Sequence, residues 1–562
     1  MNSKIKLFLS VRPEGSGSTA YLKGQTISNF FLIRTDPSST QHKAAPLRTN
    51  GKKTYLEKIF FYSLLALSTS IHSLILTSHS DFISKGITCL QQQNLDEAYT
   101  YFLQALAQSP TDPEQLRTIG NNLLLLGNTF YTNYQLEKAA NVFEKLTALF
   151  PTSASVHFNL GFTLNELTRY HQAQDCFKKA CVLKPDAADF QVALATALLA
   201  TGDYETGWQL YEKRWELPDK KTMIMNAPQW DGIASLRNKT MLLLSEGALG
   251  DCIQFVRYAQ VLKSHGATII LKTLKPLHLL LSNCPYIDSI IIDGATPTYD
   301  YYTSLMSLPA LLHTSLRLST SSDLATLRKS SGLKANSGVY PEQGEWDRQA
   351  IPTNIPYIFP DNELKKSWHN ILNKDQHFNI GICWQADAAN DANRPPLARR
   401  SIPAELFAPL ADLPGIKLYS LQHGQTAPSF MHDFGPDLDK TNGRFMDTSA
   451  IISNLDLVIS VDTSIAHLAS ALGTTTWVIL PYKADWRWLH EGDAHSTTPT
   501  GHAQDDNEKN LLKNKIDYAT QSPWYPGMKL VRKKQNESWH EVIEHIAQTL
   551  SKIDLHKKGI NT

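Results

Sequence analysis

Hydrophobic positions in the first half of the chain follow the period of helices, and one set of them recurs at a fixed spacing. The set repeats after 34 residues, as Ala139, Phe143, Ala148 and Pro151 and then as Ala173, Phe177, Val182 and Pro185. A similar set stands 41 residues before the first, so that unit contains seven extra residues. A period near 34 is typical of stacked pairs of antiparallel helices. We therefore expect about four such units between residues 81 and 218.

Small residues and prolines at fixed places in each unit favour this pairing. Gly86, Gly161 and Ala195 would let two helices approach closely, and a proline after each second helix would end it, because proline lacks a backbone donor. We expect the recurring aromatic residues to pack in the core; they are Phe102, Phe143, Phe177, Tyr211 and Trp215. The concave face of such an array could bind a protein partner.

From residue 238 onward, short β-rich runs alternate with helical stretches, which indicates parallel sheets with crossover helices. In a first series we expect strands at 240–245, 267–273 and 287–293 and helices at 251–265 and 276–283. In a second series we expect strands at 379–385, 416–422, 457–461 and 475–480 and a helix at 464–472. Ligands of such sheets bind beyond the carboxyl ends of the strands, so the loops there should carry the chemistry.

The first of these loops contains Gly247 and Gly250 and ends at Asp251. Glycines would permit a tight turn, and Asp251 would stand at the start of the next helix. An N-terminal cap, in which the carboxylate accepts first-turn amides, is the simpler interpretation of Asp251. The loop is neither the G-x-G-x-x-G dinucleotide fingerprint nor a P-loop, which leaves hydride transfer and nucleotide hydrolysis without support.

The second loop runs from Asp462 through Thr463 and Ser464 into a helix that carries His467. Free amides and the positive end of the helix dipole could hold a phosphate group there. The alternative is that Asp462 or Thr463 caps the helix and that His467 is a core residue.

Charge and cysteine content narrow the function classes. The chain has 54 Lys and Arg against 53 Asp and Glu, so no global field would attract nucleic acid, and we expect none as a partner. Its six cysteines form no C-x-x-C pair, which favours reduced thiols in the cytoplasm.

Residues 1–58 carry ten basic and three acidic residues and are expected to be a disordered tail that could touch the inner face of the membrane. Residues 59–78 are expected to form an apolar helix rather than a membrane anchor.

Several motifs, taken in order, resemble a known family. They include EGALGDCIQFVRY at 246–258, Arg-Ser-Ile at 400–402, DLVISVDTSIAH at 456–467, DWRW at 485–488 and SPWYP at 522–526. With the repeats, they are similar to bacterial fusions of tetratricopeptide repeats to a family 9, heptosyltransferase-like glycosyltransferase domain. The resemblance covers most of residues 80–550.

This resemblance implies an α + α/β chain, with a tetratricopeptide solenoid followed by a GT-B glycosyltransferase of two Rossmann-like lobes. The expected domains are the repeats at 79–218, an acceptor lobe at 219–375, a nucleotide-sugar lobe at 376–551 and a tail at 552–562.

The activity that the resemblance implies is inverting, metal-independent glycosyl transfer from a nucleotide-sugar donor to the hydroxyl of an unknown acceptor, with no cofactor. Asp251 matches the family's base. The donor would be bound by the loop of Asp462, Thr463 and Ser464, by a guanidinium clamp of Arg399 and Arg400, by Gln422 and by His467, for which we expect a positive charge near the leaving group. The competing hypothesis is a protein-binding scaffold whose glycosyltransferase half has lost turnover.

Overall fold

The structure, a computed structural model, describes residues 81–108, 112–218, 226–292, 297–314, 351–372, 377–490 and 520–553. The expectations for residues 1–58 and 59–78, and for most of the tail at 552–562, lie outside these ranges. The described residues form two compact units, one of residues 81–201 with 209–218 and the other of residues 202–208 with 226–553. No helix within the described ranges is both long enough and apolar enough to cross a membrane.

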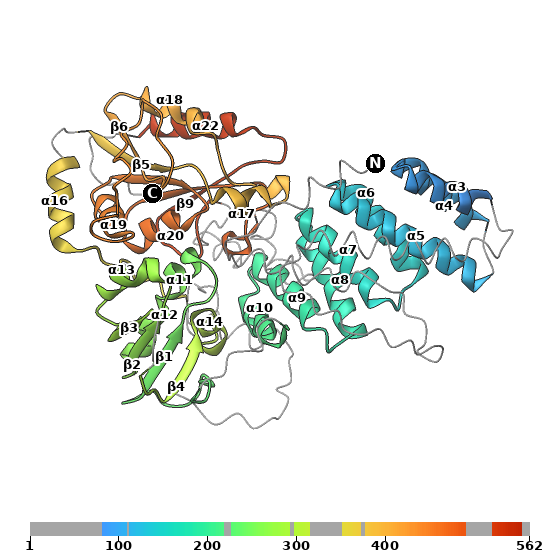
Figure 1. Cartoon of the computed structure of the whole chain (residues 1–562), viewed down its shortest axis with the longest axis horizontal. Coiled ribbons are helices and arrows are strands. Elements are labelled where there is room, and N and C mark those ends of the chain that lie inside the picture. Colours follow the sequence, from blue (N-terminus) through green and yellow to red (C-terminus); the bar gives the residue numbers. More distant parts are fainter. Residues whose placement is uncertain are drawn as a thin grey trace, which may run out of the picture. The chain divides into compact units, whose positions relative to one another are not determined.

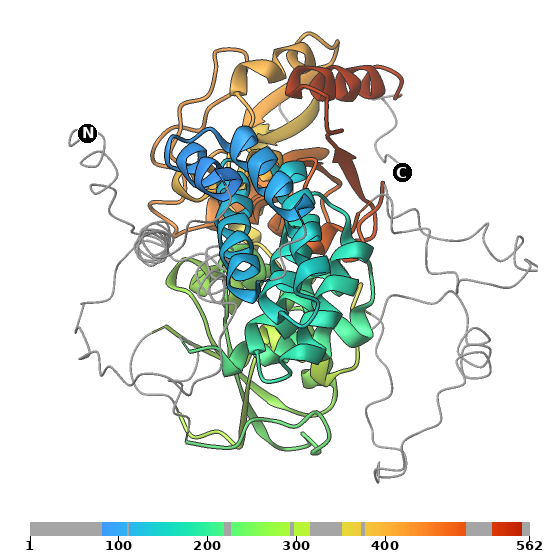
Figure 2. The same cartoon turned by 90° about the vertical axis from the view of Figure 1, so that its right-hand side faces the viewer.

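The first unit is the expected array of paired helices, seen as a stack in Figure 2. Its helices are α3 (Asp81–Gln91), α4 (Leu95–Ala107), α5 (Pro113–Thr132), α6 (Leu136–Leu149), α7 (Ala154–Glu166), α8 (Tyr170–Leu183) and α9 (Ala188–Ala200), with the 3₁₀ helix η3 (Glu212–Glu216). Helix α3 packs on α4, α5 on α6, and α7 on α8, and successive pairs pack on each other. The expected helical solenoid is therefore confirmed.

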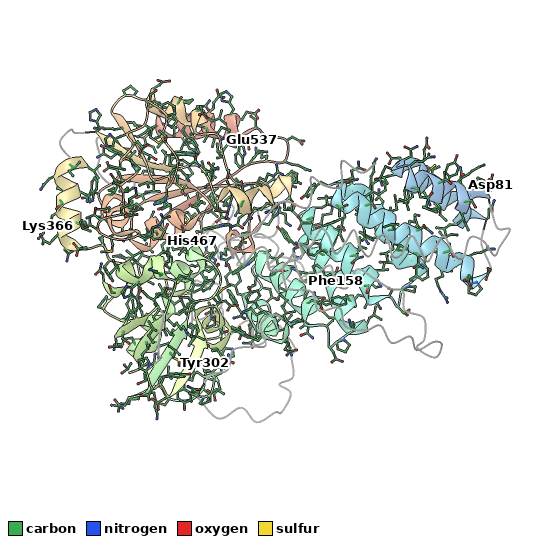
Figure 3. The ribbon with its side chains drawn as sticks, viewed as in Figure 1. Asp81, Phe158, Tyr302, Lys366, His467 and Glu537 are labelled. Carbon is green, nitrogen blue, oxygen red and sulfur yellow. The ribbon has the colours of Figure 1, made fainter. Side chains whose placement is uncertain are left out.

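Each pair is held by a glycine of its first helix that lies against a phenylalanine of its second. A Cβ atom on Gly86 would lie 2.7 Å from the ring of Phe102, and one on Gly127 would lie 2.8 Å from Phe143. The phenylalanines are buried, and Figure 3 shows Phe158 of α7 inside the same array. The sequence repeat is thus a packing repeat, because only glycine leaves room for the ring.

The two aromatic residues at the end of the array, Tyr211 and Trp215, are half-buried rather than part of the core as expected. The side chain that is buried there is Arg214, whose guanidinium lies 4.7 Å from the centre of the Tyr211 ring and 4.8 Å from that of Trp215. The aromatic faces therefore cover a buried cation.

Residues 202–208 group with the second unit, although the sequence placed them in the repeats. They include the start of α10 (Tyr204–Tyr211). The Tyr204 ring stacks on Trp524 at 5.5 Å between centroids, and Trp208 meets the rings of Phe255 and Trp486 edge to face at 5.6 and 5.2 Å. Burial of these large aromatic surfaces explains the grouping.

The second unit consists of two lobes, each built on a fully parallel sheet (Figure 1). The first sheet has β1 (Thr240–Leu244), β2 (Thr268–Lys272), β3 (Ser289–Ile291) and β4 (Tyr301–Ser304), in the order β3-β2-β1-β4. The second has β5 (Phe378–Cys383), β6 (Ile416–Ser420), β7 (Leu457–Val461), β8 (Thr476–Leu480) and β9 (Met528–Arg532), in the order β6-β5-β7-β8-β9. The two expected Rossmann-like lobes are confirmed. Strands β4 and β9 were not predicted, because their polar residues hide the β pattern.

The helices of the first lobe are α11 (Leu249–Phe255), α12 (Tyr258–Ser264), α13 (His278–Ser282) and α14 (Leu308–Leu311). Those of the second are α16 (Asn362–Leu372), α17 (Ala388–Ala392), α18 (Ala408–Ala411), α19 (Met446–Ile452), α20 (Ser464–Ala471) and α22 (Trp539–Leu550). The single helix expected at 251–265 is wrong, since α11 and α12 are separate there. Helices α11 and α20 pack on each other and join the lobes.

Arg257 lies between α11 and α12, and its side chain is completely buried at the junction of the lobes. It donates to the carbonyl oxygens of Pro352 at 3.2 Å and Trp524 at 2.5 Å and to the Tyr357 hydroxyl at 2.9 Å. Its guanidinium also lies 4.4 Å from the centre of the Tyr525 ring. One side chain of the first lobe therefore binds two segments that are far away in the sequence.

Candidate functional site

The loop after β1 holds Asp251 close to its own backbone. Gly247 has a φ of +80°, and a Cβ atom there would overlap Oδ2 of Asp251, so glycine is required. Helix α11 then begins at Leu249, and Oδ2 of Asp251 accepts a hydrogen bond of 2.7 Å from the amide of Ala248. Asp251 is therefore the third residue of α11 rather than its N-cap residue, which is Ala248, but its carboxylate does make a capping bond at this helix end.

Asp251 also forms an ion pair with the second lobe. Its Oδ1 accepts a hydrogen bond from Nη2 of Arg487, in the 3₁₀ helix η8 (Trp486–Trp488). Arg487 donates in addition to Oδ1 of Asp485 at 2.7 Å and to Oε1 of Gln254 at 2.9 Å. The side chains of Asp251 and Arg487 are only 7% and 10% exposed, so this bridge between the lobes is shielded from water. The sequence analysis missed Arg487, although it lies in the DWRW motif.

The loop after β7 leads into α20 at Ser464. Thr463 stands at the N-cap position but makes no side-chain cap bond; its hydroxyl lies 3.1 Å from that of Ser460. Asp462 instead pairs with Arg400, with 3.0 Å between Oδ2 and Nη1. The alternative interpretation, in which Asp462 or Thr463 caps the helix through its side chain, is therefore wrong.

Asp462 is a charged carboxylate in a buried place. Burial alone would raise its pKa, but the positive charge of Arg400, aided by Arg394, lowers the pKa below 3.8. Arg399, the other half of the expected clamp, is exposed, and its side chain lies 3.4 Å from the backbone oxygens of Arg394 and Ala392. In this structure Arg400 therefore lies against the β7 loop, whereas Arg399 bonds to its own loop.

His467 lies in α20 where the two lobes meet (Figure 3). Burial lowers its pKa to about 3, so the imidazole is neutral near pH 7. Its Nδ1 lies 2.8 Å from the hydroxyl of Tyr525, and its ring stacks on Trp488 with 5.3 Å between centroids. The expectation that His467 provides a positive charge is wrong, because a buried ring among aromatic neighbours does not hold a proton.

Gln422 follows β6 and joins the ends of two strands. Its Oε1 accepts a hydrogen bond of 2.9 Å from the amide of Gln385 and lies 3.5 Å from the Sγ atom of Cys383, at the end of β5. Cys383 in turn lies 3.6 Å from the Thr463 hydroxyl. Gln422 is thus connected to the Thr463 turn through one side chain.

Strand order places these groups where parallel sheets bind ligands. In the second sheet the order reverses between β5 and β7, where Cys383 ends β5 and Thr463 lies in the turn after β7. In the first sheet it reverses between β1 and β4, where Oγ of Ser304 donates a hydrogen bond of 2.7 Å to Glu246. The Glu246 and Ser304 pair was missed because β4 was missed.

The two loops are in direct contact. A Cβ atom on Gly250 would lie 3.1 Å from Cδ2 of His467 and 3.8 Å from the Cα atom of Ser464. The loop of the candidate base and the candidate donor loop therefore come from opposite lobes and meet at Gly250. Within the described ranges no three His, Cys, Asp or Glu side chains gather closely enough to hold a metal ion.

Comparisons with known proteins find relatives of both halves. Residues 163–213 match the tetratricopeptide repeat family. The chain is 22% identical over 492 residues to protein FlbA of Caulobacter vibrioides, covering 81% of this chain and 70% of that protein.

Three solved structures are similar to parts of the chain. A family 9 glycosyl transferase from Veillonella parvula covers 58% of this chain and 94% of its own, at 14% identity and a TM-score of 0.32. The ADP-heptose heptosyltransferase II of E. coli covers 55% and 97%, at 13% identity and a TM-score of 0.31. The MamA protein covers 24% and 70%, at 21% identity and a TM-score of 0.21. The chain thus carries an array of paired helices, of which residues 163–213 match the tetratricopeptide repeat family, followed by two Rossmann-like lobes.

Proposed function

We propose that the two-lobe unit is a glycosyltransferase that transfers a sugar from a nucleotide-sugar donor to an acceptor hydroxyl. The observation that carries the proposal is the contact of Gly250, the neighbour of Asp251, with Ser464 and His467 at the lobe junction, beside the order reversals of both sheets. The candidate base of one lobe thus belongs to a loop that contacts the candidate donor turn of the other.

The proposed reaction is a single displacement with inversion at the anomeric carbon. Asp251 takes the proton of the acceptor hydroxyl as that oxygen bonds to the carbon, and the bond from the carbon to the diphosphate oxygen breaks with its electron pair. The diphosphate leaves toward the amides at the start of α20 and toward Arg400, which stabilise its charge without a metal ion or cofactor. His467, being neutral, would contribute a hydrogen bond rather than a charge.

One observation favours the second candidate function, an inactive scaffold for protein binding. Asp251 is 7% exposed, accepts a hydrogen bond from the Ala248 amide and pairs with Arg487, so its carboxylate is poorly placed to meet an acceptor. The function of the protein would then lie in the repeats, which would bind a protein partner. In the enzyme hypothesis the same repeats present the acceptor.

Turnover separates the two hypotheses. Full-length protein is incubated with ADP-, UDP-, GDP- and dTDP-sugars and candidate acceptors, and release of nucleoside diphosphate is measured. We expect release with one donor class and its loss in Asp251→Asn, with diphosphate binding retained. Asp437→Asn, at an 85% exposed side chain, is the matched control and should keep full activity. Equal turnover by Asp251→Asn would show that Asp251 is not the base. No release of nucleoside diphosphate from any donor would favour the scaffold hypothesis.

The other parts of the proposal concern partners and setting. All six cysteines lie within the described ranges and are unpaired, which fits a reducing cytoplasmic environment. We propose no nucleic-acid partner, because the chain has no excess of basic residues. Contact of the basic tail at 1–58 with the membrane is tested by liposome partitioning of the protein with and without those residues.

A further inference from the structure

We propose that Arg487 is a binding residue for the diphosphate of the donor, and that Asp251 occupies its guanidinium when no donor is present. Diphosphate binding would then release the base at the moment when it is needed. This inference rests on the proposed nucleotide-sugar site and adds a residue that the sequence motifs did not assign to it.

The first support is the placement of Arg487 between carboxylates of both lobes. It bonds Asp251 of the first lobe and Asp485 of the second, and its guanidinium lies 4.3 Å from the centre of the Trp486 ring. A planar guanidinium donates in pairs, so it can exchange a carboxylate for a phosphate in the same geometry. Trp486 would hold the side chain in place during the exchange.

The second support is the electrostatic effect of Arg487 on the donor turn. Its positive charge contributes to lowering the pKa of both Asp462 and His467, so it acts electrostatically on the groups that flank the start of α20. A diphosphate bound at the Ser464 turn would therefore be attracted by the positive charge of Arg487 as well as by that of Arg400. Two guanidiniums from different loops match the two phosphate groups of the leaving group.

The third support is an unsatisfied donor beside Arg487. Gln254 is completely buried and accepts from Nε of Arg487, but its own Nε2 has no hydrogen-bond partner among the described residues. A buried amide donor without an acceptor costs free energy. An oxygen of a bound anion next to the guanidinium would supply that acceptor.

The exchange itself forms and breaks no covalent bond. With no donor, the carboxylate of Asp251 offsets the charge of Arg487 inside the protein. With donor, the diphosphate offsets that charge, and Asp251 stays deprotonated and becomes able to accept the proton of the acceptor hydroxyl. By this route Asp251 can act as a base only after the donor has bound, because the donor diphosphate has to displace its carboxylate from Arg487.

The competition can be measured by titrating full-length protein with ADP, UDP, GDP and dTDP in a calorimeter. In Asp251→Asn the replacement keeps an oxygen for the Ala248 amide but removes the competing charge, so we expect the diphosphate to bind about tenfold more tightly. In Arg487→Gln we expect binding to weaken about tenfold or more. The double variant should bind like Arg487→Gln alone, because Asp251 then has nothing to compete for. Arg237→Gln and Asp437→Asn, both at exposed positions, are the matched controls.

The outcomes separate this inference from the proposed function. If a diphosphate binds but Asp251→Asn leaves its affinity unchanged or weaker, the exchange is wrong, while the glycosyltransferase site stands. If the effects of the two single variants add in the double variant, the exchange is also wrong. If no diphosphate binds to the parent protein, both proposals fail. Should Arg487→Gln not fold, Arg487→Lys and the Asp251→Asn titration still decide the question.

Discussion

Nη1 of Arg400 lies 3.0 Å from Oδ2 of Asp462, in a pair whose side chains are 18% and 9% exposed. This pair belongs to the turn that we propose for the donor diphosphate, and it keeps a buried carboxylate charged next to a site for anions. The stability of the folded protein should therefore depend strongly on Arg400.

We expect Arg400→Met to lower the free energy of unfolding at pH 7 by about 3 kcal/mol, because it leaves Asp462 buried without its partner. The pKa of Asp462 lies below 3.8 in the folded protein, so the pair stabilises at higher pH and the benefit is lost as the pH falls through the folded pKa. The difference between parent and variant should shrink in acid. Urea unfolding followed by tryptophan fluorescence measures it. Lys440→Met, at an exposed pair, should change stability by less than about 0.5 kcal/mol, and an equal effect of both variants would contradict the prediction.

His467 gives a second prediction, from its pKa of about 3 against a usual value of 6.5. Between these values the unfolded chain binds a proton at this position and the folded protein does not. The histidine should therefore reduce stability as the pH falls from 6.5 toward 3, by up to about 1.4 kcal/mol per pH unit.

The ring resonances of His467 in an NMR spectrum, assigned by their loss in His467→Gln, should not shift between pH 8 and pH 5. A midpoint for His467 near 6.5 would show that the ring is not buried as described.

Arg257 gives a third prediction, because it binds segments from separate parts of the chain. Arg257→Met should destabilise the two-lobe unit by about 3 kcal/mol, since it leaves buried oxygens without donors. Arg257→Lys should restore little, because an ammonium lacks the planar fork that reaches three oxygens. Denaturation with urea measures both, and Arg237→Met is the control at an exposed arginine. Full rescue by lysine would mean that charge alone matters.

The repeat array gives a fourth prediction. Gly127→Ala would place a Cβ atom 2.8 Å from the ring of Phe143, and such overpacking costs about 1–3 kcal/mol, more than the gain of up to about 1 kcal/mol in helix propensity. We expect lower thermal stability of the array, followed by circular dichroism. In a Phe143→Leu background the same change should cost less, because the smaller side chain leaves room. Equal costs in both backgrounds would contradict the contact.

The sequence by itself determined the parts of this protein that depend on local periodicity. The 34-residue spacing of Phe143 and Phe177 predicted the helix pairs, because such a period is typical of stacked antiparallel helices. Strand, loop and helix patterns predicted the two lobes and singled out Asp251 and the turn at Thr463. These patterns can be recognised from residues that are close together in the sequence, without knowing which distant residues they contact.

Tertiary structure alone decided the state of the candidate site. The partner of Asp251 is Arg487, 236 residues away in the chain, and no local pattern couples them. The charge of His467 likewise depends on its burial against Trp488 and Tyr525. Both residues lie outside α20, in segments that come later in the chain. Electrostatic properties arise from all the groups that surround an atom, and only folding brings those groups together.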